Sequence, residues 1–268
     1  MNIAVVGCAG RMGQMLIQQM MTHSACTLIG GTEDSSSAVL GQDIGIQAGI
    51  SWVGIPVTSD PLALFKRADV VIDFTVPEAT VTHAQLAIAC QTALVIGTTG
   101  LTRDQEEALH QAARHVPVVY AANMSIGITL LSWLVEQIVK RVDCSFDIEI
   151  LEMHHRQKRD APSGTALMLG RTAASGRGVA FDEVAIMNRD RVSAPRPEGG
   201  IGITALRGGD VIGDHTVIFA GSGERLEITH KATGRHIYAT GAITAALWTQ
   251  DRPPGLYTMA DVLESRSS

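Results

Sequence analysis

The chain opens with a strand, a glycine-rich turn and a helix in immediate succession. Residues 2–7, NIAVVG, are a short β-branched run that ends in glycine, and residues 11–21 carry apolar side chains at helical spacing. The turn between them, GCAGRMG, has glycines at positions 7, 10 and 13. Such a turn lets a phosphate approach the backbone, and the start of the helix offers free N–H groups to it. The segment therefore predicts the first part of a βαβ nucleotide-binding unit.

The spacing of these glycines is G-x-x-G-x-x-G, whereas the common dinucleotide motif is G-x-G-x-x-G. The turn alone therefore leaves open a glycine-rich loop that binds nothing. Glu33 favours a ligand, because it ends the second predicted strand twenty residues after Gly13. A carboxylate at that place binds the ribose hydroxyls of adenosine. The turn and the carboxylate together predict a dinucleotide site.

Strands and helices alternate through the first part of the chain. Strands are predicted over residues 26–31, 69–75, 93–100 and 116–123, and helices over residues 77–90 and 102–115. This alternation predicts parallel βαβ units, and the continuous apolar strands suit a sheet buried on both faces. The stretches IGTTG (96–100) and AANMS (121–125) end two strands, where parallel sheets bind their ligands. Each also suits an ordinary turn, but beside the glycine turn they favour contacts to the nicotinamide half of the dinucleotide.

The pattern changes after residue 124. A long helix is predicted over residues 125–142, a strand over 146–154, a helix from Pro162, alternating strands within 200–231 and a last helix over 235–250. We therefore expect a dinucleotide-binding domain over residues 1–124 and a second, α+β domain over residues 125–234. The C-terminal helical segment, residues 235–268, is expected to return to the first domain.

Composition excludes several classes of function. The net charge is −6, which argues against a general nucleic-acid binder. The sequence has no run of about eighteen apolar residues, so we expect no membrane span. The first residues lack the basic region of a secretory signal, and the four cysteines (8, 26, 90 and 144) form no C-x-x-C pair. We therefore expect reduced thiols and a cytoplasmic protein.

The stretch EMHHRQKRDAPSGTA, residues 152–166, carries the densest chemistry. A metal site is disfavoured, because adjacent histidines on an extended segment point to opposite sides and no H-E-x-x-H spacing is present. One of the two histidines also suits an ordinary core position. An acid–base and anion site accounts for more of the stretch. With Pro162 in the first helical turn, residues 163–165 present N–H groups to a carboxylate, while His154 and Lys158 donate protons.

Seven stretches occur in order along nearly the whole chain: GCAGRMG, IDFT-PE, VIGTTG, AANMSIG, E-HH--K-DAPSGTA, R-GD-IGDHT--F and ERLEITHKA. Together they resemble the dihydrodipicolinate reductase (4-hydroxy-tetrahydrodipicolinate reductase) family of lysine and diaminopimelate biosynthesis. The resemblance implies an α/β fold, in which a Rossmann-like parallel-sheet domain is joined to an α+β domain with an open mixed sheet. It also implies a homotetramer assembled through the second domain.

The resemblance further implies an oxidoreductase that acts on a small cyclic dicarboxylate. NADH or NADPH delivers a hydride to 4-hydroxy-tetrahydrodipicolinate, which loses water and becomes tetrahydrodipicolinate. No metal, nucleic acid or membrane takes part.

The roles implied for single residues fall into three sets. The cofactor is bound by Gly7, Cys8, Ala9, Gly10, Arg11, Met12 and Glu33 at its adenosine and pyrophosphate end, and by Gly97, Thr98, Thr99, Ala121, Ala122, Asn123 and Met124 at its nicotinamide end. The catalytic residues are His154 and Lys158. The substrate is bound by His155, Gly164 and Thr165, to which the helix-start argument adds Ser163.

NADH is the expected cofactor of the two. A 2′-phosphate needs cationic partners after the second strand, and this chain has Glu33 followed by Asp34 there. No Lys or Arg occurs between Arg11 and Lys66, whereas family members that use NADPH well commonly carry a basic residue directly after the acid. The serines at positions 35–37 leave room for some use of NADPH.

Two other classes stay open at this stage. A dehydrogenase of the same architecture, of the aspartate or homoserine type, would share the glycine turn but gives no reason for the stretch HHRQKRDAPSGTA. A non-catalytic redox sensor would need the turn and not Lys158.

Overall fold

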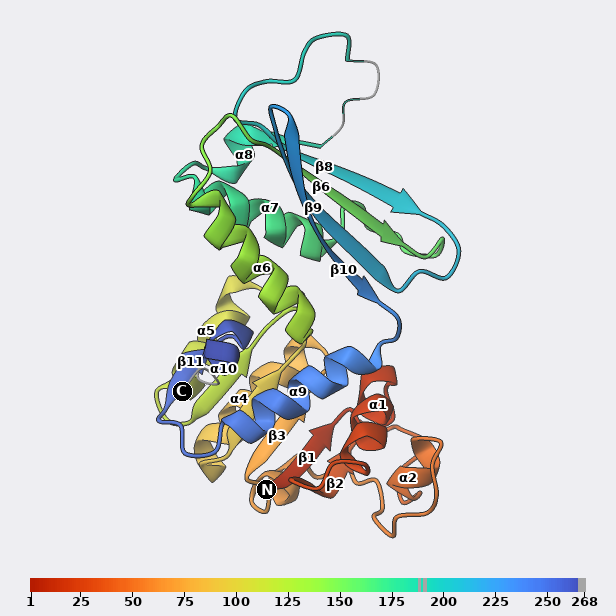
Figure 1. The fold of residues 1–268 in the computed structure, drawn as a ribbon. Helices are drawn as coiled ribbons and strands as arrows, with labels where there is room; N and C mark the ends of the chain where they lie inside the picture. Colours follow the sequence, from red (N-terminus) through yellow and green to blue (C-terminus); the bar gives the residue numbers. More distant parts are fainter. Residues whose placement is uncertain (188, 190–191, 265–268) are drawn as a thin grey trace. The chain divides into compact units, whose positions relative to one another are not determined.

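The structure, a computed structural model, describes residues 1–187, 189 and 192–264 of the 268 residues. The chain divides into two compact units (Figure 1). The first unit contains Met1–Ile126 and His236–Ser268, and the second contains Gly127–Arg235. None of the helices in the described ranges combines the length and the apolar composition needed to cross a lipid bilayer.

A parallel sheet forms the centre of the first unit. In its described part the strands are β1 (Asn2–Val6), β2 (Thr27–Thr32), β3 (Val70–Asp73), β4 (Ala93–Ile96), β5 (Pro117–Tyr120) and β11 (Gly255–Tyr257), in the order β11-β5-β4-β3-β1-β2. Every neighbouring pair is parallel. The carboxyl ends of β2, β1, β3, β4 and β5 therefore lie side by side along one edge.

Helices cover both faces of this sheet (Figure 1). They are α1 (Arg11–Met20), α2 (Ile44–Gln47), α3 (Pro61–Phe65), α4 (Pro77–Cys90), α5 (Arg103–Ala113), α9 (His236–Trp248) and α10 (Met259–Glu264). Alternate strand residues pack on opposite sides: Ile3 and Val5 join the apolar cluster of α1 and α9, whereas Ala4 and Val6 join that of α4 and α5. This explains the uninterrupted apolar strands of the sequence.

Helix α9 packs against α1 in the first unit. A Cβ at Gly241 would lie 1.7 Å from the carbonyl oxygen of Met124, so only glycine permits this close approach to the segment after β5. The short elements α2, α3, α10 and β11 were not predicted, because three to six residues carry too little periodicity to distinguish them from loops.

The second unit is built on a mixed sheet. Its elements are α6 (Ile126–Val139, beginning at the boundary), β6 (Asp147–His154), α7 (Gly164–Gly176), α8 (Phe181–Val184), β7 (Ala185–Ile186), β8 (Ile201–Arg207), β9 (Gly213–Gly221) and β10 (Glu224–Ala232). The order is β10-β9-β6-β8-β7, antiparallel from β10 to β6 and parallel from β6 to β7. The predicted fold class, a Rossmann-like parallel sheet plus an α+β part with a mixed sheet, is confirmed.

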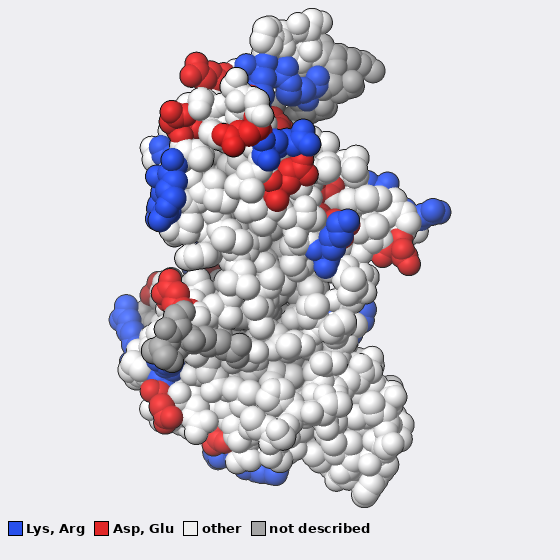
Figure 2. All heavy atoms as spheres, viewed as in Figure 1, with Lys and Arg blue, Asp and Glu red and all other residues white. Residues whose placement is uncertain are grey.

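The two faces of the mixed sheet differ. One face packs against α6 and α7 through buried residues such as Ile148, Ile150 and Phe219. In the described residues, Figure 1 shows no helix of this unit on the opposite face, where Leu151 and Leu206 are exposed. Basic and acidic side chains are interspersed on the surface that Figure 2 shows, and they form no extended patch of one sign there.

Candidate active site

The glycine turn of the first unit is shaped for close backbone approach. Gly7 has a φ of +67°, and a Cβ on it would lie 2.7 Å from Cγ2 of Thr75. A Cβ on Gly13 would lie 2.3 Å from the carbonyl oxygen of Gly7, so α1 packs against the turn only because this residue is glycine. The N-cap residue of α1, Gly10, has no side chain to cap the helix. The first N–H groups of α1 are therefore available to a pyrophosphate, and the turn fits the group that the sequence predicts.

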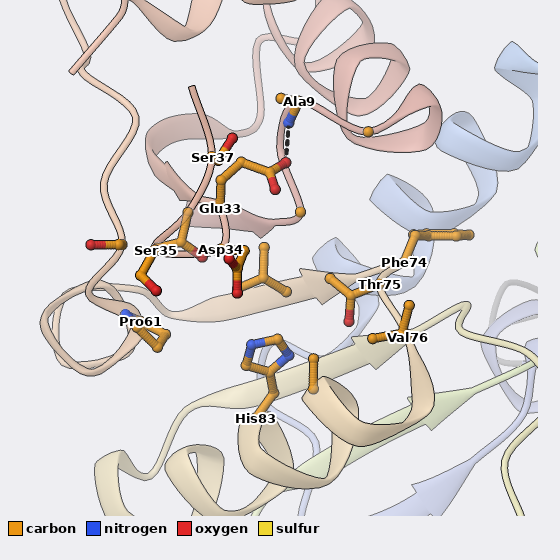
Figure 3. A pocket seen from close by; sticks show the side chains of 16 residues that line it. Ala9, Glu33, Asp34, Ser35, Ser37, Pro61, Phe74, Thr75, Val76 and His83 are labelled. Atoms are coloured by element: carbon orange, nitrogen blue, oxygen red, sulfur yellow. Dashed lines mark hydrogen bonds between the residues drawn. The ribbon is translucent and has the colours of Figure 1, made fainter. Parts of the chain in front are cut away.

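A cavity of about 750 Å³ opens beside this turn (Figure 3). It is lined by Val6, Gly7, Ala9, Gly10, Thr32, Glu33, Asp34, Ser35, Ser37, Ser59, Pro61, Phe74, Thr75, Val76, Ala79 and His83. The Glu33 carboxylate accepts a hydrogen bond of 2.7 Å from the backbone N–H of Ala9, which ties the end of β2 to the turn. Its second oxygen accepts no hydrogen bond from the described residues and suits the ribose hydroxyls.

Asp34 follows directly on the same wall. Its carboxylate accepts hydrogen bonds from the hydroxyl and the amide of Ser36, at 2.6 and 2.9 Å. These hydrogen bonds hold the pKa of Asp34 below its ordinary value, so its charge persists at neutral pH.

Cys8, which is also predicted at this end of the cofactor, contributes in a different way. Burial, with the charge of Glu33, raises the pKa of the Cys8 thiol to about 12, so Cys8 offers its backbone and not a thiolate.

The residues predicted at the nicotinamide end follow β4 and β5, which are neighbours in the sheet. Gly97 lies under Phe74, because a Cβ on it would be 2.1 Å from the ring. Thr98 is buried and donates to the carboxylate of Asp73, so its hydroxyl serves the protein interior. Residues 121–124 run from the half-buried Ala121 to the buried Met124. Both segments stand at the same sheet edge as the glycine turn.

In the second unit a buried carboxylate organises the predicted catalytic stretch. Glu152 is fully buried, and its Oε2 accepts a hydrogen bond of 2.6 Å from Nδ1 of His154. Arg207 donates to both carboxylate oxygens at 2.8 Å, and the amide of Ser163 donates to Oε1 at 3.0 Å. Glu152 and His154 share a face because they are two residues apart on β6, and Arg207 lies opposite His154 in β8.

These contacts define which nitrogen of His154 is reactive. Burial raises the pKa of Glu152, but the hydrogen bonds from Arg207, His154 and Ser163 more than offset it and hold that pKa below its ordinary value. The ionised carboxylate accepts only, so Nδ1 of His154 carries the hydrogen and Nε2 faces away from Glu152. A Cβ on Gly213 would come within 3.0 Å of Nε2, so a glycine there leaves space beside this nitrogen.

His154 is held mainly in its neutral form. Burial lowers its pKa, the charges of Lys158 and Arg207 lower it further, and Glu152 acts in the opposite sense. A neutral imidazole with Nδ1–H directed at a carboxylate is a proton acceptor at Nε2, and it becomes a donor there after gaining a proton. The Lys158 ammonium lies 2.9 Å from the carboxylate of Asp160, and it is partly buried. Its charge is close enough to act on His154.

A second buried imidazole supports the start of α7. Nε2 of His215 lies 3.1 Å from the hydroxyl of Ser163, and the His215 ring stands edge-on to His154 with centroids 5.2 Å apart. Ser163 in turn caps α7 by accepting a hydrogen bond from the amide of Ala166. Burial is the largest of the effects that lower the pKa of His215 to about 4, so it is neutral at neutral pH.

The helix start differs from the prediction in one detail. Pro162 precedes the N-cap Ser163 instead of lying in the first helical turn, and α7 begins at Gly164. Ser163 is 2% exposed, and its amide and hydroxyl are paired inside the unit. Gly164 and Thr165 are therefore the residues that present the helix N-terminus. His155 is half-buried directly after the last residue of β6.

Sequence reasoning assigned no role to Glu152, Arg207 or His215. The signal for Glu152 was present, since strand alternation places it on the face of His154. Arg207 and His215 lie in the stretch RGGDVIGDHT, more than fifty residues away in sequence, and only the strand pairing of β6 with β8 and β9 brings them to Glu152. Among the described residues, no group of three or more His, Cys, Asp or Glu side chains is arranged to hold a metal ion.

Comparison with known families agrees with this geometry. A family described as "Dihydrodipicolinate reductase, N-terminus" matches residues 1–124, and "Dihydrodipicolinate reductase, C-terminus" matches residues 127–263. This chain belongs to the dihydrodipicolinate reductase family. The predicted resemblance is thereby confirmed.

Individual members of the family align over nearly the full length. The 4-hydroxy-tetrahydrodipicolinate reductase of Rhizobium rhizogenes is 51% identical over 264 residues, which are 98% of this chain and 96% of that protein. The enzyme of the same name from Brucella abortus is 49% identical over 264 residues, 98% of each chain. A dipicolinate-bound dihydrodipicolinate reductase from Paenisporosarcina sp. TG-14 has the same fold, with a TM-score of 0.78 over 98% of this chain and 99% of that one, at 24% identity.

Proposed function

We propose that this chain reduces 4-hydroxy-tetrahydrodipicolinate to tetrahydrodipicolinate with loss of water, using NADH in preference to NADPH. The observation that carries the proposal is the Glu152–His154 pair, which leaves Nε2 of the imidazole open beside Lys158 and the start of α7. The names of the family members support the same reaction. The reaction belongs to lysine and diaminopimelate biosynthesis, and the four free cysteines support a reducing cytoplasm as its place.

The substrate is a dicarboxylate, and the second unit offers it an anion site. One carboxylate accepts hydrogen bonds from the amides of Gly164 and Thr165 at the N-terminus of α7 and from the side chain of His155. Ser163 does not contact the substrate in this proposal. Its hydrogen bonds to Glu152 and His215 instead position the helix start.

Two residues handle protons. Loss of the ring hydroxyl as water leaves a conjugated imine, and when bound the cofactor supplies a hydride to its ring carbon. The electron pair of the imine bond moves to the ring nitrogen, where the ammonium of Lys158 stabilises it. Nε2 of His154 delivers the proton that the ring gains after the hydride. The negative charge of the bound dicarboxylate favours the protonated imidazole, and Glu152 stabilises that form through its hydrogen bond with Nδ1.

The cofactor preference is supported by the wall of the cavity that carries Glu33 and Asp34. Asp34 is ionised at the place where a 2′-phosphate would lie, and neither Arg11 nor another Lys or Arg is among the described residues that line the cavity. A 2′-phosphate beside this carboxylate would meet a like charge with no cation to compensate it, which disfavours NADPH. We expect kcat/KM to favour NADH, and Asp34→Arg to narrow or reverse the preference.

Asp34→Asn is the matched control for this substitution, because it removes the charge and keeps an oxygen that accepts from Ser36. Its NADPH-to-NADH ratio of kcat/KM should fall between those of the unmodified protein and Asp34→Arg. A preference for NADPH in the unmodified protein would contradict the argument, whatever the two variants do.

The activity is tested by generating the unstable substrate with its synthase and following the oxidation of NADH. Dipicolinate, a planar dicarboxylate, should inhibit this turnover and raise the melting temperature when NADH is present. A dehydrogenase acting on another substrate, or a redox sensor, would bind NADH without oxidising it when the synthase product is the substrate offered. If dipicolinate neither inhibits nor stabilises, the substrate assignment is wrong.

A further inference from the structure

One arginine of the second unit contacts both the carboxylate that holds His154 and the loop that carries Lys158. Arg207 is the last residue of β8, and its side chain is 20% exposed. One terminal nitrogen donates to Oε2 of Glu152 at 2.8 Å and to the carbonyl of Leu206 at 2.6 Å. The other donates to Oε1 of Glu152 at 2.8 Å and to the carbonyl of Asp160 at 2.6 Å. The N–H groups of both terminal nitrogens are therefore bound by the protein and not offered to a substrate.

The first set of bonds fixes the carboxylate of Glu152. This side chain is 0% exposed on the face of β6 that also buries Ile148 and Ile150. Two parallel N–H···O bonds from a planar guanidinium prevent the carboxylate from turning, so Oε2 stays directed at Nδ1 of His154. A buried ion pair is often no more stabilising than well-packed apolar side chains. Orientation of His154 therefore explains these buried charges better than stability does.

The bond to the carbonyl of Asp160 reaches the loop after β6. The carboxylate of the same residue lies 2.9 Å from Nζ of Lys158. The loop is also tied to the end of β8 next to Arg207, because the amide of Gly208 donates to the carbonyl of His154 at 2.9 Å. A single side chain thus orients the imidazole on one side and holds the chain segment of the ammonium on the other.

Four titratable or charged side chains surround His154. They are Glu152 from β6, Lys158 from the loop after it, Arg207 from β8 and His215 from β9. Burial is the largest effect on the pKa of His154 and lowers it, Glu152 raises it, and the charges of Lys158 and Arg207 lower it. Loss of the guanidinium would remove one lowering effect and leave the Glu152 carboxylate without this cationic partner. Both changes favour the protonated imidazole.

We propose that Arg207 is a positioning residue for the reaction: it orients His154 through Glu152, and it holds the loop that carries Lys158. Arg207 itself does not touch the substrate. This inference rests on the proposed function, because it requires His154 and Lys158 to act on one substrate. It adds that one guanidinium controls both the charge of the imidazole and the placement of the two proton-handling groups.

The first test measures His154 without turnover. Nitrogen NMR spectra of protein that carries isotope-labelled histidine, recorded against pH, give the pKa and the tautomer of each ring, and His154→Gln identifies the signal of His154. Arg207→Ala should raise the pKa of His154 by about one unit or more. Arg207→Lys keeps a positive charge and should raise it less. An unchanged pKa in Arg207→Ala would overturn the inference.

The second test separates geometry from charge. Lysine has a single nitrogen, so it cannot bind both oxygens of Glu152 and the carbonyl of Asp160 in the way a guanidinium does. Arg207→Lys should therefore lower kcat by about ten- to a hundredfold, the usual effect of a small misplacement of reacting groups. The KM for the substrate should change less than kcat. Full kcat in Arg207→Lys would contradict the positioning role.

Arg177→Ala is the matched control, because Arg177 is also a half-buried arginine of the second unit. It donates to the carbonyls of Phe146 and Gly199 at 2.5 and 3.0 Å and has no contact with Glu152. Its removal should lower the melting temperature and leave the pKa of His154 in place. If Arg207→Ala does the same and no more, Arg207 is structural and the inference is wrong.

The two proposals fail in different ways. If Arg207→Ala shifts the pKa of His154 but the unmodified protein does not reduce the synthase product, the proposed function is wrong and the orientation of His154 by Arg207 stands. If the unmodified protein reduces that product and the pKa of His154 stays unchanged in Arg207→Ala, only the role of Arg207 is wrong.

Discussion

Three imidazoles in this chain show how much a single neighbour decides. His154 and His83 each direct Nδ1–H at a buried carboxylate, so each has Nε2 available. His215 has no carboxylate partner at either nitrogen, and its Nδ1 is buried without a hydrogen bond in the described residues. Residue type alone therefore does not separate a reactive histidine from a structural one, because the partner of Nδ1 decides it.

The catalytic assignment makes a direct prediction. His154→Gln and Lys158→Ala should each lower kcat by about 10²–10⁴-fold, the usual contribution of a general acid or base. The dissociation constant for NADH should change little, because both residues belong to the second unit and not to the one that carries the glycine turn. Steady-state kinetics and calorimetry measure the two quantities. A loss of NADH affinity as large as the loss of rate would show that these residues are structural.

The buried His215 makes stability depend on pH. Its pKa is about 4 in the folded chain and 6.5 ordinarily, so the unfolded chain binds the extra proton between these values. Stability is therefore lost as pH falls through this window. His215→Gln keeps a partner for Ser163 and cannot ionise. The free energy of unfolding of the variant minus that of the unmodified protein should rise by about 2 kcal/mol when the pH is lowered from about 7.5 to about 5.

Denaturant titrations of both proteins at the two pH values measure this change. The carboxylates titrate in the same way in both proteins, so their effect on stability cancels in the difference. A constant difference between the proteins would show that His215 is accessible to protons in the folded state.

At the scale of elements, two helix starts carry the proposed anion contacts and achieve this by different means. Helix α1 has glycine at its N-cap and leaves its first amides open, whereas α7 has Ser163 as a capping side chain. The cap on α7 is itself held by His215 and Glu152. The first start suits a large pyrophosphate, and the second presents only the amides of Gly164 and Thr165 to a small carboxylate.

Gly13→Ala tests the first helix start. The new Cβ would collide with the carbonyl of Gly7, so α1 must shift, at a cost of about 1–3 kcal/mol in the free energy of unfolding. The affinity for NADH should fall by about tenfold or more, because the shift moves the first amides of α1 away from the glycine turn and the two can no longer bind the pyrophosphate together. Melting temperature and calorimetry measure both effects.

Gly164→Ala is the matched control, because a Cβ there meets no atom within 4 Å. Its melting temperature and NADH affinity should be unchanged. An unaltered NADH affinity in Gly13→Ala would contradict the role given to the turn.

At the scale of the whole molecule, the uncovered face of the second sheet predicts assembly. Leu151 and Leu206 are 36% and 45% exposed on neighbouring strands, where a lone chain would leave them in water. We propose that this face pairs with further copies of the chain to form a homotetramer. Light scattering should give four chain masses at micromolar concentration.

Leu206→Glu should shift the assembly toward smaller species, because a carboxylate is costly to bury at a contact between sheets. Trp52→Lys is the control: Trp52 is 73% exposed on the first unit, and its replacement should leave the mass unchanged. A stable monomer of the unmodified protein would overturn the proposal.

The sequence by itself determined the parallel sheet, the glycine turn with Glu33, and the helix start beside His154 and Lys158. These features are local: strand and helix periods, a turn that tolerates only glycine and a capping serine are each written within about twenty consecutive residues. The family followed from the same short stretches. Elements of three to six residues, such as α3 and β11, fell below what periodicity can detect.

Only the tertiary structure decided which polar groups meet. Glu152, Arg207 and His215 come together because β6 pairs with β8 and β9 across more than fifty residues of sequence. Asp73 meets His83 because α4 packs on one face of the parallel sheet, in the apolar cluster that also contains Val71 of β3. Ser163 was expected at the substrate, and the fold turns its hydrogen bonds inward. Pairing between distant strands depends on packing of the whole sheet, which no local pattern encodes, and that pairing selects the reactive nitrogen of each histidine.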